Sequence, residues 1–159
     1  MKRIIITLIT LSLIVFCPVT TSNAAVIRQH SIEYLTDGSY YETTITTNDF
    51  HSYSLIRTAS LTRSANKTTT YTSSSGAKLW SVTVTGNFSY VKGKSSKCTS
   101  SSVSAVSYSA SWKISNKSSS KSGNTATASA TVLQYSGTRP VNSVTRKVSL
   151  TCDVNGILS

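Results

Sequence analysis

The chain of 159 residues has few acidic side chains, and their distribution is uneven. Five Asp and Glu residues stand against sixteen Lys and Arg residues, which gives a formal net charge of +11. Four of the acids precede residue 50 and the fifth is Asp153, so residues 50–152 carry thirteen bases and no carboxylate. Glycoside hydrolysis needs two facing carboxylates, and calcium or magnesium sites need several oxygen ligands together. We therefore exclude both from most of the chain and interpret the four early acids as surface charge.

Histidine is also scarce, since only His30 and His51 are present. A Ser-His-Asp site could use His51 and Asp49, but residues two apart on a strand share a face without the buried geometry that orients a triad. No G-x-S-x-G elbow occurs, and no S-x-x-K followed by K-T-G. We interpret the chain as non-enzymatic and without a cofactor. No base-stacking motif accompanies the positive charge, so no nucleic-acid partner is expected.

The first 24 residues have the layout of a secretory signal peptide. Two bases at 2–3 precede an apolar run at 4–16, and the small-residue segment 22–24 follows as a cleavage site. The apolar run is shorter than the roughly 20 residues that cross a bilayer, so no transmembrane segment is expected. We predict cleavage after Ala24 and a single secreted, extracellular domain over residues 25–159, with a net charge of 14 − 5 = +9.

Cysteine is limited to three positions, and Cys17 belongs to the predicted signal peptide. A lipid anchor at Cys17 is not favoured, because the bulky Phe16 stands where a small residue is needed. Cys98 and Cys152 remain as an even pair in an exported chain, which predicts a disulfide. It would close a loop of about 55 residues and contribute about 4 kcal/mol in the chain-entropy model. The alternative is two free thiols or a two-ligand metal site, although two cysteines without a nearby histidine do not make a zinc site.

The clearest structural signal is an alternation of apolar and polar residues over 78–90. A period of two over this length predicts a strand with one buried and one wet face. Gly86 falls on the buried face, where a bulge or a close backbone approach would explain it. The buried row consists of Trp80, Val82, Val84, Phe88 and Tyr90, and Ser or Thr residues stand between most of them.

Further strands follow from similar patterns and from turn residues between them. Asp37-Gly38 separates two strand-like segments and predicts a hairpin. An even row resumes over 106–114, whereas Val103 and Ala105 have the opposite parity, so a bulge or a change of sheet is expected near Ala105. The predicted strands are 30–34, 40–45, 52–61, 67–72, 78–90, 106–114, 125–135 and 141–152.

About eight strands at nearly regular spacing predict an all-β fold. A β-sandwich, immunoglobulin-like or similar, with one disulfide is favoured over a small barrel. Small residues recur at Ala126, Ala128 and Ala130, which is what a strand needs if it faces large rings. We expect this alanine row to face Trp80 and Trp112 in the core.

Several segments also resemble a known group of proteins. These are S-G-A-K-L-W (75–80), T-G-N-F-S-Y (85–90), K-C-T-S-S-S-V-S (97–104), S-W-K-I-S (111–115), K-S-G-N-T-A-T-A-S-A-T-V (121–132) and V-S-L-T-C-D-V-N-G-I-L-S (148–159). Together they resemble the small, uncharacterised secreted proteins of clostridial Gram-positive bacteria. The resemblance implies a bacterial source and an extracellular location, but it implies no activity.

The positive charge is the feature that points to a partner. Two lysine clusters are candidates for binding anionic polymers, because an acid-free basic face attracts them through a salt-dependent field. Their residues are Lys92, Lys94 and Lys97 in the first cluster and Lys113, Lys117 and Lys121 in the second. A third basic group is Arg139, Arg146 and Lys147. The alternative is that these lysines only keep a sheet protein soluble and protect its edges.

Tyrosine is the other candidate for contacts, because a tyrosine ring gives contact area at low entropy cost and serine supplies adaptable hydrogen bonds. Tyr40, Tyr41 and Tyr53 are the surface candidates, whereas Tyr90 and Tyr108 are expected in the core. We therefore expect a secreted, non-enzymatic protein that binds an anionic cell-wall polymer or a surface glycan at the cell envelope or a host surface. The alternative is a cationic antibacterial or toxin-like protein acting on membranes, which the Ser/Thr-rich outer rows disfavour.

Overall fold

The computed structural model describes residues 26–47 and 60–159, with side chains from Gln29 onward. The predicted signal peptide and most of the strand predicted at 52–61 lie outside the described residues, as do Asp49, His51 and Tyr53. The described ranges contain eight strands and are all-β. Their bounds are β1 Val26–Tyr34, β2 Tyr40–Thr47, β3 Leu61–Thr72, β4 Lys78–Val91, β5 Ser95–Ser107, β6 Trp112–Ser122, β7 Thr125–Ser136 and β8 Arg139–Thr151.

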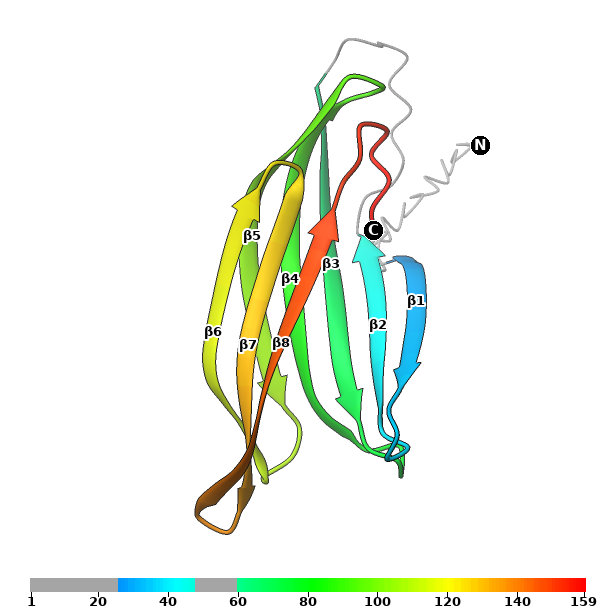
Figure 1. Cartoon of the computed structure of the whole chain (residues 1–159). Coiled ribbons are helices and arrows are strands. Elements are labelled where there is room, and N and C mark those ends of the chain that lie inside the picture. Colours follow the sequence, from blue (N-terminus) through cyan, green and yellow to red (C-terminus); the bar gives the residue numbers. More distant parts are fainter. Residues whose placement is uncertain (1–25, 48–59) are drawn as a thin grey trace, which may run out of the picture.

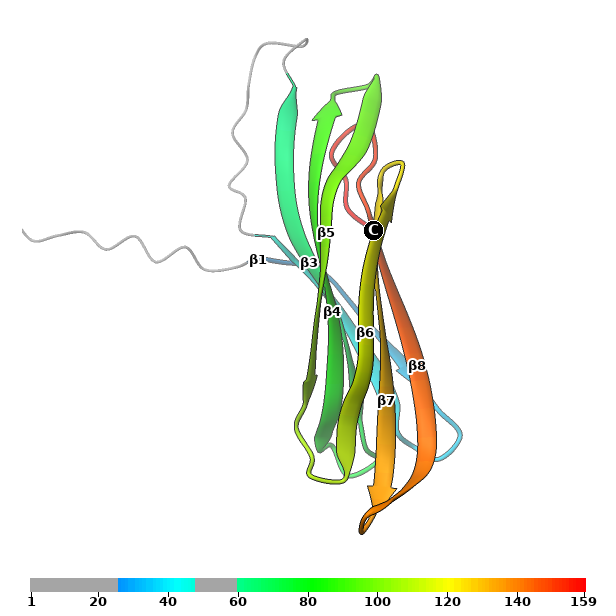
Figure 2. The same cartoon turned by 90° about the vertical axis from the view of Figure 1, so that its left-hand side faces the viewer.

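The strands form two antiparallel sheets that face each other (Figures 1 and 2). β1 to β5 make a five-stranded sheet in sequence order, and β6 to β8 make a three-stranded sheet in sequence order. The prediction of a β-sandwich is therefore confirmed in its broad form. The immunoglobulin-like arrangement is not found, because that fold uses Greek-key connections, whereas every ladder here joins neighbours in sequence.

The alternating strand directions place the turns at two ends of the molecule (Figure 1). We call one the Gly38 end, formed by the turns at 35–39, 73–77, 108–111 and 137–138. The other is the Gly93 end, formed by the turns at 92–94 and 123–124 and by the C-terminal segment 152–159. The hairpin predicted at Asp37-Gly38 is confirmed: Tyr34 pairs with Tyr40, and Gly38 has φ = 80°, a conformation that favours glycine.

The period of two in β4 is confirmed by burial. Trp80, Val82, Val84 and Phe88 are fully or almost fully buried, and the side chains between them face away from the core. Gly86 lies in the same inward row, where a Cβ atom would stand 2.7 Å from the Phe88 ring and 3.0 Å from Ala126 Cβ. The expectation of a close approach at Gly86 is therefore correct, and Ala126 places β7 directly across from it.

The alanine row of β7 is buried as predicted, but it does not face both tryptophans. Ala126, Ala128 and Ala130 have exposed fractions of 0–1%. Trp112 pairs with Gln134, so it lies beside the row in the same sheet and cannot be opposite to it. The two indoles instead meet each other at 6.3 Å between ring centroids and join Tyr71 and Tyr41 in an aromatic cluster.

The strand predicted over 106–114 is wrong, because the chain changes sheet inside it. β5 ends at Ser107 and β6 begins at Trp112, while Trp112 N–H donates to the Ser109 carbonyl at 3.1 Å within the connecting turn. In this part of β5, Val103 and Ala105 pack against the core. The odd-numbered residues therefore face inward here, and Val106 faces outward. Tyr108 is 55% exposed, contrary to the expectation that it is a core residue, and its hydroxyl lies 3.1 Å from Ser81 Oγ on the outer face.

The outward rows of Ser and Thr form hydrogen bonds between neighbouring strands. Thr68 and Thr83 hydroxyls lie 2.8 Å apart across β3 and β4, and Thr131 and Thr145 lie 2.9 Å apart across β7 and β8. Such cross-strand pairs contribute roughly 0.2–1 kcal/mol each. The Ser- and Thr-rich composition therefore belongs to the outer faces of an ordered sheet protein, with polar but largely uncharged surfaces.

The aromatic cluster leads to a first prediction. Trp80 is completely buried and has Tyr41, Tyr71 and Trp112 within 5.4–6.3 Å between ring centroids. Trp80→Ala should lower the free energy of unfolding by about 3–5 kcal/mol, because it removes a large ring from a packed core. Chemical denaturation monitored by circular dichroism measures this loss.

Trp80→Phe is the matched control for this substitution. In the described part of the chain the indole Nε1 has no hydrogen-bond partner, so its removal breaks no such bond. Phe should therefore cost clearly less than Ala. Equal losses for both variants, or no loss for Ala, would contradict the central position of this ring.

Candidate functional site

The structure brings four of the six candidate lysines to the Gly93 end. Lys92 and Lys94 lie in the β4–β5 turn, Lys97 lies near the start of β5, and Lys121 lies near the end of β6. All four are exposed, and we call them the lysine surface. Lys121 is about 25 residues from the other three lysines in sequence and lies on a strand of the other sheet. The four lysines are brought together because β5 packs beside β6.

Lys97 and Lys121 border a shared hollow on this surface. Its volume is about 550 Å³, and its other lining residues are Ser95, Ser96, Cys98, Ser122 and Gly123. The Lys121 ammonium donates to the Thr99 carbonyl, which links β6 to β5 across the two sheets. The hollow thus offers two cations and several hydroxyl groups together. Asp153 is the one described acid at this end of the molecule, and one of its carboxylate oxygens accepts the Asn155 and Ile157 N–H groups at 2.8 and 2.7 Å.

The two remaining candidate lysines lie elsewhere. Lys117 is exposed midway along β6 and lines a separate hollow of about 370 Å³ with Asn116 and Ala105. Lys113 lies towards the Gly38 end, where its ammonium stands 4.8 Å from the centre of the Tyr135 ring. The expected cluster of Lys113, Lys117 and Lys121 is therefore spread along β6. Eleven-residue strands are about 35 Å long, which explains why closeness in sequence does not bring these lysines together.

The structure does not contain the predicted disulfide between Cys98 and Cys152. Both residues are buried free thiols. Cys98 N–H donates to the Gly123 carbonyl at 2.8 Å, and Cys152 N–H donates to the Asn124 carbonyl at 3.1 Å. The backbones of both cysteines are therefore hydrogen-bonded to adjacent residues of the β6–β7 turn.

Burial sets the chemistry of both thiols. It raises the pKa of Cys98, although the Lys121 ammonium acts in the opposite direction. Burial likewise raises the pKa of Cys152. Because the thiolate is the reactive form, both cysteines should react slowly in the native protein.

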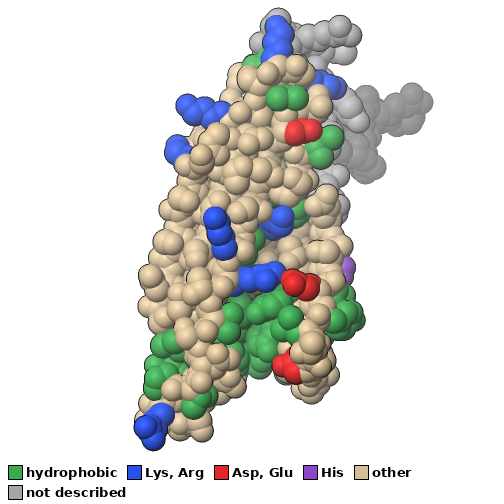
Figure 3. All heavy atoms as spheres, viewed as in Figure 1, with side chains coloured by type: hydrophobic (Ala, Val, Ile, Leu, Met, Phe, Trp, Pro, Cys, Tyr) green, Lys and Arg blue, Asp and Glu red, His purple; other side chains and the backbone are tan. Residues whose placement is uncertain are grey.

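A second surface feature is an open groove between β8 and the neighbouring inner face of β1, β2 and β3 (Figure 3). Its volume is about 670 Å³. We call it the Arg146 groove, and it is lined by residues 31–33 of β1, Tyr41 and Thr43 of β2, Lys67 and Thr69 of β3, and residues 146–149 of β8. It exists because the five-stranded sheet is wider than the three-stranded sheet, which leaves part of its inner face uncovered.

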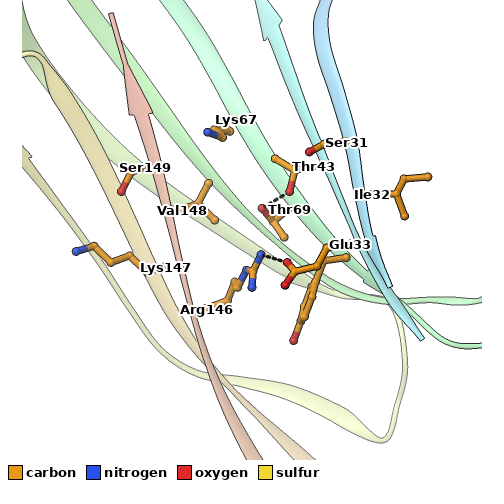
Figure 4. Close-up of a pocket in the computed structure, with 11 residues that line it drawn as sticks. Ser31, Ile32, Glu33, Thr43, Lys67, Thr69, Arg146, Lys147, Val148 and Ser149 are labelled. Carbon is orange, nitrogen blue, oxygen red and sulfur yellow. Dashed lines mark hydrogen bonds and ion pairs between the residues drawn. The ribbon is translucent and has the colours of Figure 1, made fainter. Parts of the chain in front are cut away.

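Arg146 spans this groove from β8 to β1. Its Nη2 lies 3.2 Å from Glu33 Oε2, and its guanidinium carbon lies 4.2 Å from the centre of the Tyr41 ring (Figure 4). Burial raises the pKa of Tyr41, whereas the Arg146 charge acts to lower it. Arg146 is therefore neutralised by Glu33 and held against an aromatic face.

Lys67 lies in the same groove but has a different environment. It stands between Ala65 and Thr69 in the inward row of β3, and burial lowers the pKa of its ammonium. Among the residues that the structure describes, no carboxylate lies within ion-pair distance of Lys67. Thr43 and Thr69, whose hydroxyls lie 3.0 Å apart, occupy the space between Lys67 and Arg146 (Figure 4).

The groove was not predicted as a site from the sequence, although a signal for it was present. Lys67 and Arg146 each occupy an inward position of a strand, where the neighbouring inward residues are apolar or buried: Ala65 and Thr69 beside Lys67, and Val144 and Val148 beside Arg146. A base on the buried parity is unusual, because isolated charges are costly to bury. In the sequence analysis Arg146 was grouped with its neighbours Arg139 and Lys147, so its inward position was overlooked. In the structure Arg139 lies at the Gly38 end, and the Lys147 side chain points away from the groove (Figure 4).

The remaining candidates take other positions. Tyr41 is half-buried in the aromatic cluster, and Tyr40 lies 5.5 Å from Tyr34 between ring centroids. His30 Nε2 lies 2.8 Å from Glu42 Oε1 on the exposed outer face of β1 and β2. No group of three potential metal ligands occurs in residues 26–47 and 60–159. Over the same ranges, no helix is long and apolar enough to cross a membrane.

Searches against protein-family models, curated proteins and solved structures find no match to this chain. The resemblance to clostridial secreted proteins therefore stays an expectation.

The two thiols give a second prediction. Alkylation of the unfolded, unreduced protein should label both Cys98 and Cys152, whereas the native protein should be labelled slowly because burial keeps both thiols protonated. Mass spectrometry of alkylated Cys98 and Cys152 peptides measures this. A result of no label on either cysteine until reductant is added would mean that the two thiols form a disulfide.

Proposed function

We propose that this chain is a secreted, non-enzymatic binding protein that attaches through its lysine surface to an anionic polymer of the cell envelope or of a host surface. The supporting observation is the convergence of Lys97 and Lys121, from different sheets, on one serine-lined hollow beside Lys92 and Lys94. Exposed cations close together attract a polyanion more strongly than the same cations spread over the surface. Hydroxyl groups between them can hydrogen-bond the polymer.

The polymer class follows from charge and chemistry. Teichoic acid and anionic phospholipid headgroups both present repeated phosphates outside a Gram-positive cell. Lysine is suited to such ligands, because its ammonium binds phosphate as a point charge without the fixed geometry of a guanidinium. A flexible polymer with many equivalent phosphates requires no more than this.

A membrane-inserting toxin is the competing function, and the outer faces of the sandwich argue against it. Insertion of strands into a bilayer needs an apolar outward row. The outward rows here consist mostly of Ser and Thr, and pairs such as Thr68–Thr83 and Thr127–Ser149 are hydrogen-bonded between strands. A polar face of this kind suits contact with a hydrated polymer.

The third prediction tests attachment directly. The purified protein should sediment with Gram-positive cell walls at low ionic strength and be released as salt rises, because contacts between exposed charges are screened within about 8 Å at physiological ionic strength. Walls stripped of teichoic acid should bind much less. Replacing Lys94, Lys97 and Lys121 with Glu should abolish sedimentation while changing stability by only about 0.5 kcal/mol for each substitution.

The matched control places the same charge change at the other end of the molecule. Lys78, Lys113 and Arg139 lie at or near the Gly38 end and are exposed, so their replacement with Glu gives the same net charge without altering the lysine surface. Sedimentation should persist in this control. Equal losses in both triple variants would show that only net charge matters, and no sedimentation of the unaltered protein at low salt would refute the proposal. Leakage of anionic vesicles at the same concentrations would support the membrane-active alternative.

A further inference from the structure

Lys67 is an unusual residue for a sandwich interior. Its ammonium is partly withdrawn from water, and burial lowers its pKa. Withdrawing a charge from water costs free energy unless an opposite charge compensates for it. In the described ranges no carboxylate and no hydrogen-bond acceptor is paired with this ammonium. Lys67 is therefore a cation without a paired anion in the described ranges, and the open groove gives an external anion access to it.

Arg146 closes the other end of the groove and is not available in the same way. Glu33 already pairs with it at 3.2 Å, and the Tyr41 ring supports its guanidinium at 4.2 Å. This arrangement fixes one wall of the groove, although the buried Arg146 Nε has no hydrogen-bond partner in the described ranges. Lys67 is then the inward-facing cation without a paired anion. The groove thus combines a fixed polar wall with one free charge at its other end (Figure 4).

Hydroxyl groups lie between the two cations. The Thr43 and Thr69 hydroxyls lie 3.0 Å apart, and Ser31 lines the groove beside them. Thr69 is only 3% exposed, whereas Thr43 is partly exposed and Ser31 is exposed. A hydroxyl group can donate one hydrogen bond and accept two, so Thr43 and Ser31 retain capacity for a ligand. A ligand that carries an anion for Lys67 and hydroxyl groups for Thr43 and Ser31 would satisfy both features.

A polypeptide strand fits the groove less well. Strand addition requires an exposed edge with free backbone groups, and β8 is such an edge. However, β8 carries Arg146 pointing inward and Lys147 pointing outward, and charged residues of this kind on edge strands prevent pairing with another chain. The groove is therefore better suited to a ligand that is recognised by side chains.

From these observations we propose that the Arg146 groove binds a short acidic saccharide, whose anionic group pairs with Lys67 and whose hydroxyl groups bond to Thr43 and Ser31. The site is separate from the lysine surface, because it lies at the β1–β3 and β8 edge of the sandwich and the lysine surface lies at the β5–β6 edge. It would recognise one unit of a glycan, whereas the lysine surface would hold a polyanion without specificity. The two proposals can therefore fail independently.

Calorimetric titration with three probes tests the groove. Trigalacturonate supplies carboxylates, monophosphorylated galactotriose supplies a phosphate, and galactotriose is the neutral counterpart. At moderate salt we expect one or both acidic probes to bind and the neutral probe to bind at least about tenfold more weakly, because a charged hydrogen bond is lost. The preference between the first two probes identifies the anion.

Lys67→Met removes the charge and keeps an unbranched side chain of similar length. It should weaken binding of the acidic probe by about tenfold or more, while the melting temperature stays equal or rises, because a partly buried charge without a partner has been removed. Lys78→Met is the matched control: the residue is exposed at the start of β4, outside the groove, and the variant should bind as the unaltered protein does.

Ser31→Ala tests the hydroxyl contribution, because it removes one exposed hydroxyl group that lines the groove. It should weaken binding of the acidic probe without changing the preference for acidic over neutral saccharide. The proposal is overturned if neither acidic probe binds, if Lys67→Met binds as well as Lys78→Met, or if an extended acidic peptide such as hexaglutamate binds at Lys67 in preference to both saccharides.

Discussion

The packing of β7 against β4 is the constraint on which the sandwich depends. Ala126 approaches Gly86 so closely that a Cβ atom there would lie at 3.0 Å, and Phe88 covers the same glycine from within its own strand. Small residues at 126, 128 and 130 allow the two sheets to approach along this line. The cluster of Trp80, Trp112 and Tyr71 fills another part of the core. The three-stranded sheet covers only part of the five-stranded sheet, which leaves the inner face of the wider sheet partly uncovered.

The parts of the fold that depend on local pattern could be predicted from the sequence. The alternation in β4, the Asp37-Gly38 hairpin and the small-residue row of β7 each reflect a physical requirement within one or two strands. The change of sheet was expected near Ala105 but occurs at 108–111, because Val106, Tyr108 and Ala110 continue an apolar alternation although they face solvent. Tyr108 shows how a ring can cover the outer face, where it meets Ser81, without belonging to the core.

The candidate sites were predictable only in part, because they depend on contacts between strands distant in sequence. The exposed lysines were identified by charge alone, yet only the sheet arrangement separates Lys113 and Lys117 from the group at the Gly93 end. The pairing of Cys98 with Cys152 was inferred from the number of cysteines and from the expected extracellular location. Neither gives information about the β6–β7 turn, to which both cysteine backbones are hydrogen-bonded. The Arg146 groove joins β1 and β8, whose paired residues Glu33 and Arg146 are 113 positions apart. In the sequence, only the inward positions of Lys67 and Arg146 on their strands indicated this groove.

The pairing of each strand with its neighbour in sequence has a consequence for how the chain folds. Every ladder in the two sheets is a hairpin-like contact between successive strands, so most backbone pairing closes short loops and proceeds early. The docking of β7 and β8 onto β3 and β4 is the step that joins distant parts of the chain. The C-terminal segment is held by bonds to two other parts of the chain, since Arg63 donates to the Gly156 carbonyl and Gly93 N–H donates to the Val154 carbonyl. Such a chain can form its sheets strand by strand from the N-terminal side. Water is excluded from the core only when β8, the last strand, has packed against the other sheet.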